Sequence, residues 1–178
     1  MKFDALVVID VQTSLVNAHP YQEETLIQNI QKLLKECREK QIPVIYVRHD
    51  GGKNDELEAG TDGWQIYHAI APQPEDKVID KRFNSSFRQT DLREYLESIH
   101  AKNLILCGMQ TEYCIDASCK VAFEYEYKVT IAKGTTSTYD TTIACAKDLI
   151  EYYEERIWKN RYASVISLEE LVQEIKQN

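Results

Sequence analysis

The sequence predicts an α/β fold, a three-layer α/β/α sandwich built on six parallel strands. Short apolar segments of β type alternate along the chain with longer amphipathic segments, which is typical of a parallel sheet covered by helices. Most of the apolar segments are continuous rather than alternating, as burial on both faces of a sheet requires. The 178 residues suit one domain, and the sequence has neither internal repeats nor linkers rich in Pro and Gly. A single domain over residues 1–178 is therefore expected.

The six expected strands are short and rich in aliphatic or β-branched residues. They cover residues 5–9, 44–48, 77–79, 103–107, 128–132 and 163–166.

Helices are expected between these strands. Segment 23–40 carries its apolar residues on one stripe with charges opposite, and Pro43 follows as a stop. Segments 90–99 and 141–158 repeat the pattern, and Ile143 is the first residue on the apolar stripe of the second. The last segment opens with Ser167 and Glu170 in the spacing of a capping box.

Composition limits the functions and partners of the chain. A net charge of −8 argues against binding to nucleic acid and against attraction to anionic membranes. No apolar run approaches the ~20 residues of a spanning helix. The five cysteines form no C-x-x-C pair, and the start MKFDALVV lacks the features of a signal peptide. We therefore expect a reducing, cytoplasmic setting, with no nucleic-acid or membrane partner.

Three reactive side chains follow strand ends. Asp10 follows the first strand, Lys81 the third, and the fourth runs into the Gly108 turn before Cys114. In open α/β sheets, ligands bind beyond the carboxyl ends of the strands, so these side chains are expected to converge. A helix opens near Cys114, and the positive end of its dipole should favour the thiolate over the thiol.

Each of these residues also has a purely structural interpretation. A cysteine alone is more often a buried small hydrophobe, an aspartate at a strand end more often a turn former, and a lysine in a charged run more often solvated. In combination they form a catalytic set, because a carboxylate can take the thiol proton while an ammonium stabilises both anions.

These residues carry a family resemblance. The segments VVIDVQ with Asp10, VIDKRFNSSF with Lys81, and LILCGMQTEYCIDASCKVAFEYEYKVTI with Cys114 resemble the isochorismatase-like cysteine hydrolases, over roughly residues 4 to 140. The resemblance implies a Rossmann-like sheet in the order 3-2-1-4-5-6, with Asp10 and Cys114 at the point where strand order reverses. It also implies a cis peptide bond at Met109–Gln110 that helps to form an oxyanion hole.

The resemblance also leads to expectations about metals, cofactors and oligomeric state. The nicotinamidase branch of the family holds a metal through an aspartate-x-histidine pair and a second histidine, and neither is reproduced here, because His49 and Asp50 stand in the wrong order. We predict no metal and no cofactor. Relatives are commonly oligomers, so a homodimer or homotetramer is expected, with the Tyr-rich runs 123–127 or 152–162 as candidate interfaces.

The predicted activity is hydrolysis of an amide, imide or ureido C–N bond of a small molecule through a Cys114 thioester. Asp10 would act as general base and acid, and Lys81 would give electrostatic support. Two alternatives stay open: vinyl-ether hydrolysis of the isochorismatase type without covalent catalysis, and a thiol-based binding or redox module. The candidate substrate pocket residues, all close in sequence to the proposed site, are Gln12, Trp64, Phe83, Phe87 and Tyr113. The long irregular connection 49–76, which contains Trp64, is of a kind that usually serves a site and is a candidate lid.

Overall fold

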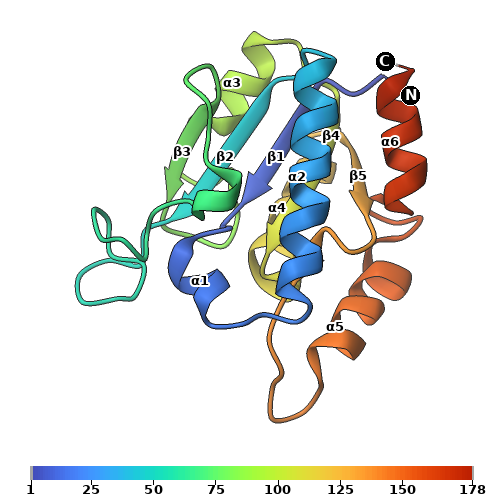
Figure 1. Ribbon diagram of the computed structural model, residues 1–178. Helices are drawn as coiled ribbons and strands as arrows, with labels where there is room; N and C mark the ends of the chain where they lie inside the picture. Colours follow the sequence, from blue (N-terminus) through green and yellow to red (C-terminus); the bar gives the residue numbers. More distant parts are fainter. Residues whose placement is uncertain (1, 178) are drawn as a thin grey trace.

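A single parallel sheet forms the centre of the computed structural model, which describes residues 2–177 (Figure 1). Its main path has the strand order β3-β2-β1-β4-β5-β7, which confirms the predicted order along six strands. A seventh, two-residue strand, β6, was not predicted and pairs in parallel with the end of β4. The strands are β1 (Ala5–Ile9), β2 (Val44–His49), β3 (Lys77–Lys81), β4 (Asn103–Met109), β5 (Lys128–Ala132), β6 (Thr136–Ser137) and β7 (Ser164–Ile166).

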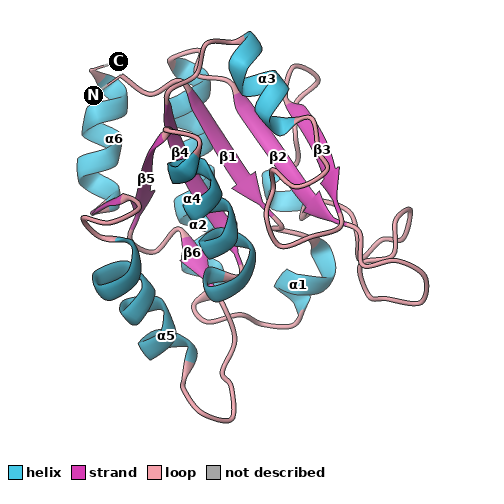
Figure 2. Ribbon diagram, turned by 180° about the vertical axis from the view of Figure 1, so that it is seen from behind, coloured by secondary structure: helices cyan, strands magenta, loops and turns pink. Residues whose placement is uncertain are grey.

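Helices cover both faces of this sheet. Helices α2 and α6 lie over one face (Figure 1), and α3 and α4 lie over the other, which Figure 2 shows from behind. The α-helices are α1 (Thr13–Asn17), α2 (Glu23–Glu39), α3 (Leu92–Ser98), α4 (Asp116–Glu124), α5 (Ala146–Tyr152) and α6 (Leu168–Lys176). Three other helical segments are the 3-10 helix η1 (His68–Ile70) and the π-helical turns η2 (Thr111–Ile115) and η3 (Tyr153–Trp158). None of the helices in the described part of the chain is long and apolar enough to cross a membrane.

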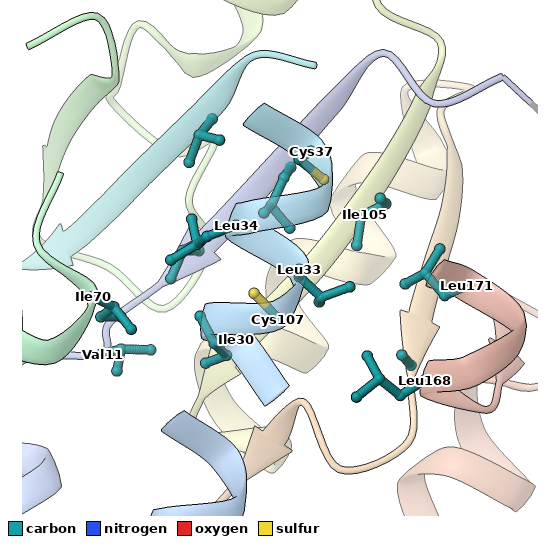
Figure 3. Packing of buried hydrophobic residues seen from close by; sticks show 14 of the residues in the cluster. Val11, Ile30, Leu33, Leu34, Cys37, Ile70, Ile105, Cys107, Leu168 and Leu171 are labelled. Atoms are coloured by element: carbon teal, nitrogen blue, oxygen red, sulfur yellow. The ribbon is translucent and has the colours of Figure 1, made fainter. Parts of the chain in front are cut away.

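Two hydrophobic clusters, one on each side of the sheet, form the core. In the first, Ile30, Leu33 and Leu34 of α2 and Leu168 and Leu171 of α6 pack toward the sheet (Figure 3). In the second, side chains of α3, α4 and η3 pack against the opposite face. Burial of each such aliphatic side chain contributes roughly 2 kcal/mol. The strand ends that carry the reactive groups are therefore held between two packed layers.

Three strands run further than predicted. β2 ends at His49, β3 at Lys81 and β4 at Met109, each one or two residues beyond the predicted end. The register pairs His49 with Lys81 across β2 and β3. Both residues therefore belong to the sheet, and their backbones are fixed by strand pairing.

The helix predicted over residues 141–158 is wrong in its first turn. α5 begins at Ala146 and gives way to η3 at Tyr153, and the side chain of Ile143 is 92% exposed instead of packed. The hydroxyl of Thr141 accepts hydrogen bonds from the backbone N–H groups of Ile143 and Ala144, and Asp140 accepts one from Ala146. Such local bonds compete with a helix, so residues 141–144 form a turn.

Candidate active site

Asp10 stands directly after β1 in a strained backbone conformation. Its φ is 52°, in the left-handed region that non-glycine residues rarely adopt, and its N–H donates to the carbonyl oxygen of Val47 at 2.8 Å. The side chain is buried, and neither carboxylate oxygen has a hydrogen-bond partner among the described residues, although Oδ2 forms an ion pair with Lys81. Residues held in this region cluster at functional sites.

Gly108 allows β1 and β4 to approach closely beside Asp10. Its φ is 120°, and a Cβ at this position would lie 2.0 Å from the carbonyl oxygen of Ile9. The register pairs Ile9 with Gly108, so the strands that lead to Asp10 and toward Cys114 are neighbours. No residue with a side chain fits at position 108, so this position must be glycine.

Lys81, the last residue of β3, reaches the same place from the other side of β2. Its side chain is almost fully buried, at 2% exposure of the residue, and Nζ lies 2.5 Å from Oδ2 of Asp10. The ammonium also donates to Sγ of Cys114 at 3.2 Å. One cation thus contacts both the carboxylate and the sulfur.

Cys114 lies in η2, between the end of β4 and the start of α4. The Met109–Gln110 peptide bond just before η2 is cis, at the position that the resemblance implies. Sγ also lies 3.9 Å from Oδ1 of Asn84, at the far limit of a sulfur hydrogen bond. The thiol is less buried than Asp10 and Lys81, so it is the member of the set that is open to a ligand.

The charge state of Cys114 differs from the prediction. Burial and the nearby Asp10 carboxylate raise the pKa of the thiol to about 12, although Lys81 acts in the opposite direction. This direction contradicts the expectation of a favoured thiolate, because burial disfavours the charged sulfur and Asp10 repels it. At neutral pH the resting site therefore holds a thiol beside the carboxyl group of Asp10.

His49 is a site residue that the sequence analysis did not select. Its Nδ1 lies 3.2 Å from Nζ of Lys81, and both burial and the Lys81 charge lower the pKa of the imidazole. The pairing of His49 with Lys81 across two strands could have revealed it, but only with the strand register in hand.

Gln12, a candidate pocket residue, is instead fully buried, and its amide group links two backbone segments. It is 0% exposed, its Nε2 donates to the carbonyl oxygens of His49 and Trp64 at 2.9 and 2.8 Å, and its Oε1 accepts from the N–H of His49 at 2.8 Å. It therefore joins the end of β2 to the 49–76 connection.

The other pocket candidates are placed differently from one another. Phe87 is buried in the second hydrophobic cluster, whereas Tyr113 is 51% exposed beside Cys114. Trp64 lies under the guanidinium of Arg48, which is 3.4 Å from its ring centroid. Phe83 lines a cavity of about 270 Å³ that adjoins Lys81, together with Asp50, Asp80, Arg82 and Gln89.

The 49–76 connection is tied to the segment after β1. The N–H of Thr13 donates to the carbonyl oxygen of Gln65, and the N–H of Tyr67 donates to that of Val11, both at 2.9 Å. Residues 65–67 therefore lie beside residues 11–13, next to Asp10.

The donor atoms of Asp10, His49 and Cys114 all lie within 4.8 Å of one another. An oxygen, a nitrogen and a sulfur at this spacing are of the types that bind transition metals. The Lys81 ammonium, however, contacts all three of these side chains, so a positive charge already stands where a metal ion would bind. Absence of a metal stays a prediction, and this arrangement is consistent with it.

The structure is an α/β fold that brings an acid, a lysine and a cysteine together at one edge of its sheet, and comparisons with known proteins identify its family. The model of the isochorismatase domain matches residues 4–170. The chain is 32% identical over 142 residues to the isochorismatase family protein YddQ of Bacillus subtilis, an alignment that covers 75% of this chain and 77% of YddQ. The chain therefore belongs to the isochorismatase family and is a hydrolase.

Other relatives have named activities. A streptothricin hydrolase of Streptomyces noursei is 28% identical over 142 residues. The alignment covers 79% of this chain but only 51% of that protein, so this chain spans about half of its length. Nicotinamidase 3 of Arabidopsis thaliana is 28% identical over 78% of this chain and 75% of its own length. Among solved structures, an isochorismatase family protein with 29% identity matches with a TM-score of 0.85, covering 92% of this chain and 97% of the other.

Proposed function

We propose that the protein is a cysteine hydrolase that cleaves a C–N bond, of the amide, imide or ureido type, in a small molecule. The observation that carries this proposal is the Lys81 ammonium, which contacts Oδ2 of Asp10 at 2.5 Å and Sγ of Cys114 at 3.2 Å in a buried site. Base, cation and nucleophile are thus within reach of one another. The names of two relatives, a nicotinamidase and a streptothricin hydrolase, support a C–N bond as the target.

The proposed reaction begins with proton transfer from the Cys114 thiol to Asp10, concerted with attack of sulfur on the substrate carbonyl. The raised pKa of Cys114 makes this coupling necessary, since little thiolate exists beforehand. Backbone N–H groups near Gln110 and Cys114 would hold the oxyanion. Asp10 then returns the proton to the departing nitrogen, which leaves as the amine, and a thioester remains on Cys114. Water, deprotonated by Asp10, attacks the thioester and releases the carboxylic acid and the thiol.

Two substitutions test this assignment because they act in opposite directions on the thiol. Asp10→Asn removes the anion that raises the pKa of Cys114, so alkylation of Cys114 by iodoacetamide at pH 8 should become faster. Lys81→Met removes the cation that lowers the same pKa, so alkylation should become slower. Both variants should lose turnover by about 100-fold or more, because the general base or its support is gone. Alkylation is measured by peptide mass spectrometry, with the exposed Cys145 as an internal reference.

Turnover is measured as amine release from a panel of amides, imides and ureido compounds, and the acyl-enzyme is sought as a mass increase on the Cys114 peptide. An Asp10→Asn variant with normal turnover would contradict the proposal. A Cys114→Ala variant that still hydrolyses a vinyl ether such as isochorismate would favour the non-covalent alternative. The redox alternative is weaker, because Cys119, its conceivable resolving partner, is fully buried in the core.

A further inference from the structure

The Lys81 ammonium has three N–H donors, and it contacts three side chains. It forms an ion pair with Oδ2 of Asp10 at 2.5 Å, donates to Sγ of Cys114 at 3.2 Å, and lies 3.2 Å from Nδ1 of His49. The first two belong to the proposed reaction. His49 is the third anchor of the ammonium, and the proposed mechanism gives it no chemical step.

His49 is held in place through its backbone groups, which leaves its imidazole free to contact Lys81. The Gln12 amide holds both the N–H and the carbonyl oxygen of His49, at 2.8 and 2.9 Å. Strand pairing with Lys81 fixes the same residue from the other side. The imidazole is therefore presented to the ammonium from a rigid support, which is what a residue that orients another requires.

We propose that His49 is a positioning residue: by accepting one N–H of Lys81 at Nδ1, it holds the ammonium between Asp10 and the Cys114 sulfur. This inference rests on the proposed function of these three residues. Without His49 the ammonium settles on Asp10, its closest and most strongly charged partner, and withdraws from the sulfur. The thiolate that forms during attack then loses its stabilising cation.

The arrangement requires a neutral His49 with its proton on Nε2. The charged groups that act on His49 are Lys81, Asp10, Asp50 and Asp55. Burial and Lys81 lower the pKa of the imidazole, which favours its neutral form, whereas the three carboxylates act in the opposite direction. Protonation would remove the acceptor and place a second cation against Lys81, so activity should fall as the pH drops through a value below the ordinary 6.5.

The test compares two substitutions at position 49. His49→Asn retains an acceptor oxygen close to the place of Nδ1, whereas His49→Leu keeps the bulk and removes the acceptor. His68→Asn, at an exposed histidine outside the site, is the control. For His49→Leu we expect about a tenfold loss of kcat with little change in KM, and about tenfold slower alkylation of Cys114 at pH 8, as for the loss of one hydrogen bond to a charged group. His49→Asn should recover most of both rates.

The pH profile separates positioning from general support of the fold. Wild-type kcat should show an acid limb that moves to lower pH in His49→Asn, because the amide at position 49 does not titrate while the general base of the proposed mechanism is retained. The profile remains decisive if His49→Leu proves unstable, since it needs only the wild type and the Asn variant. Equal alkylation and turnover in wild type and His49→Leu, or an unchanged acid limb in His49→Asn, overturns the inference while leaving the proposed function intact. A Cys114→Ala variant that keeps wild-type turnover on a C–N substrate overturns both.

Discussion

Gly108 shows how one residue decides whether the site can form. Its φ of 120° and its contact with the Ile9 carbonyl exclude a side chain, and the same pair of strand ends carries Asp10 and leads to Cys114. The site therefore depends on a position that takes no part in the chemistry.

Replacement of this glycine should be severely destabilising. Gly108→Ala would place a methyl group 2.0 Å from backbone and force a residue with a side chain to keep a positive φ, so the free energy of unfolding should fall by about 3 kcal/mol or more. Gly52→Ala is the matched control, because Gly52 also has a positive φ, of 87°, but a Cβ there meets nothing within 4 Å. It should lose only about 1 kcal/mol. Urea unfolding of both variants measures the difference, and equal losses would show that the contact with Ile9 is unimportant.

At this scale, sequence reasoning found the groups that follow strand ends but not those held by contacts between strands. Asp10, Lys81 and Cys114 could be placed together because parallel strands end at one edge. The roles of His49 and Gln12 depend on cross-strand register and on side-chain hydrogen bonds, which no spacing in the sequence encodes. The direction of the Cys114 pKa shift was missed for a related reason, since burial is a property of the folded chain.

Among the elements, η3 contains an unusual buried acid. Glu154 is 6% exposed, its Oε1 has no hydrogen-bond partner among the described residues, and burial raises its pKa to about 7. Lys133 acts against this shift, whereas Glu155 and Glu151 add to it. The carboxyl group of Glu154 is thus more easily protonated in the folded chain than in the unfolded one.

This shift makes stability depend on pH in a defined window. Because the folded state binds the proton of Glu154 more tightly, its contribution to stability is fully present below pH 4.5 and is lost as the pH rises to about 7. Glu154→Gln should abolish that loss and raise the free energy of unfolding at pH 8 by about 1–3 kcal/mol. Urea unfolding between pH 5 and pH 8 measures it. Glu75→Gln, at an exposed residue of the 49–76 connection that does not act on Glu154, should leave the wild-type slope unchanged, and an identical slope in Glu154→Gln would disprove the assignment.

The elements themselves were largely predictable, apart from those stabilised by side chains or by remote partners. Ser167 and Glu170 form the predicted capping box of α6. Residues 141–144 were misassigned because the hydroxyl of Thr141 competes for backbone N–H groups that a helix would use. β6 was missed because two residues carry no periodicity, and it exists only by pairing with β4.

For the whole molecule, the two tryptophans report on different regions. Trp158 is fully buried in the second hydrophobic cluster, whereas Trp64 lies in the 49–76 connection beside the site. A chain that forms one domain should lose both environments together.

We therefore expect a single unfolding transition. Each variant with one tryptophan is unfolded in urea: Trp158→Phe reports on Trp64, and Trp64→Phe reports on Trp158. Within each variant, the tryptophan fluorescence and the circular dichroism should change at the same urea midpoint. The comparison is made within variants, because removal of the buried Trp158 lowers stability itself. An earlier transition for Trp64 would mean that the 49–76 connection unfolds independently, as a lid would. The expected homodimer or homotetramer stays a prediction, for which the exposed Phe123, Tyr125 and Tyr152 are candidate contacts.

The raised pKa of Cys114 also predicts how the protein should respond to oxidants. Peroxide reacts with thiolates, and a thiol with a pKa of about 12 offers almost none at neutral pH. In the proposed mechanism the Cys114 sulfur is activated only as it attacks a substrate carbonyl, so between turnovers it stays in its least oxidisable form. We therefore expect the protein to keep its activity under peroxide exposure that would inactivate an enzyme with a permanently ionised cysteine.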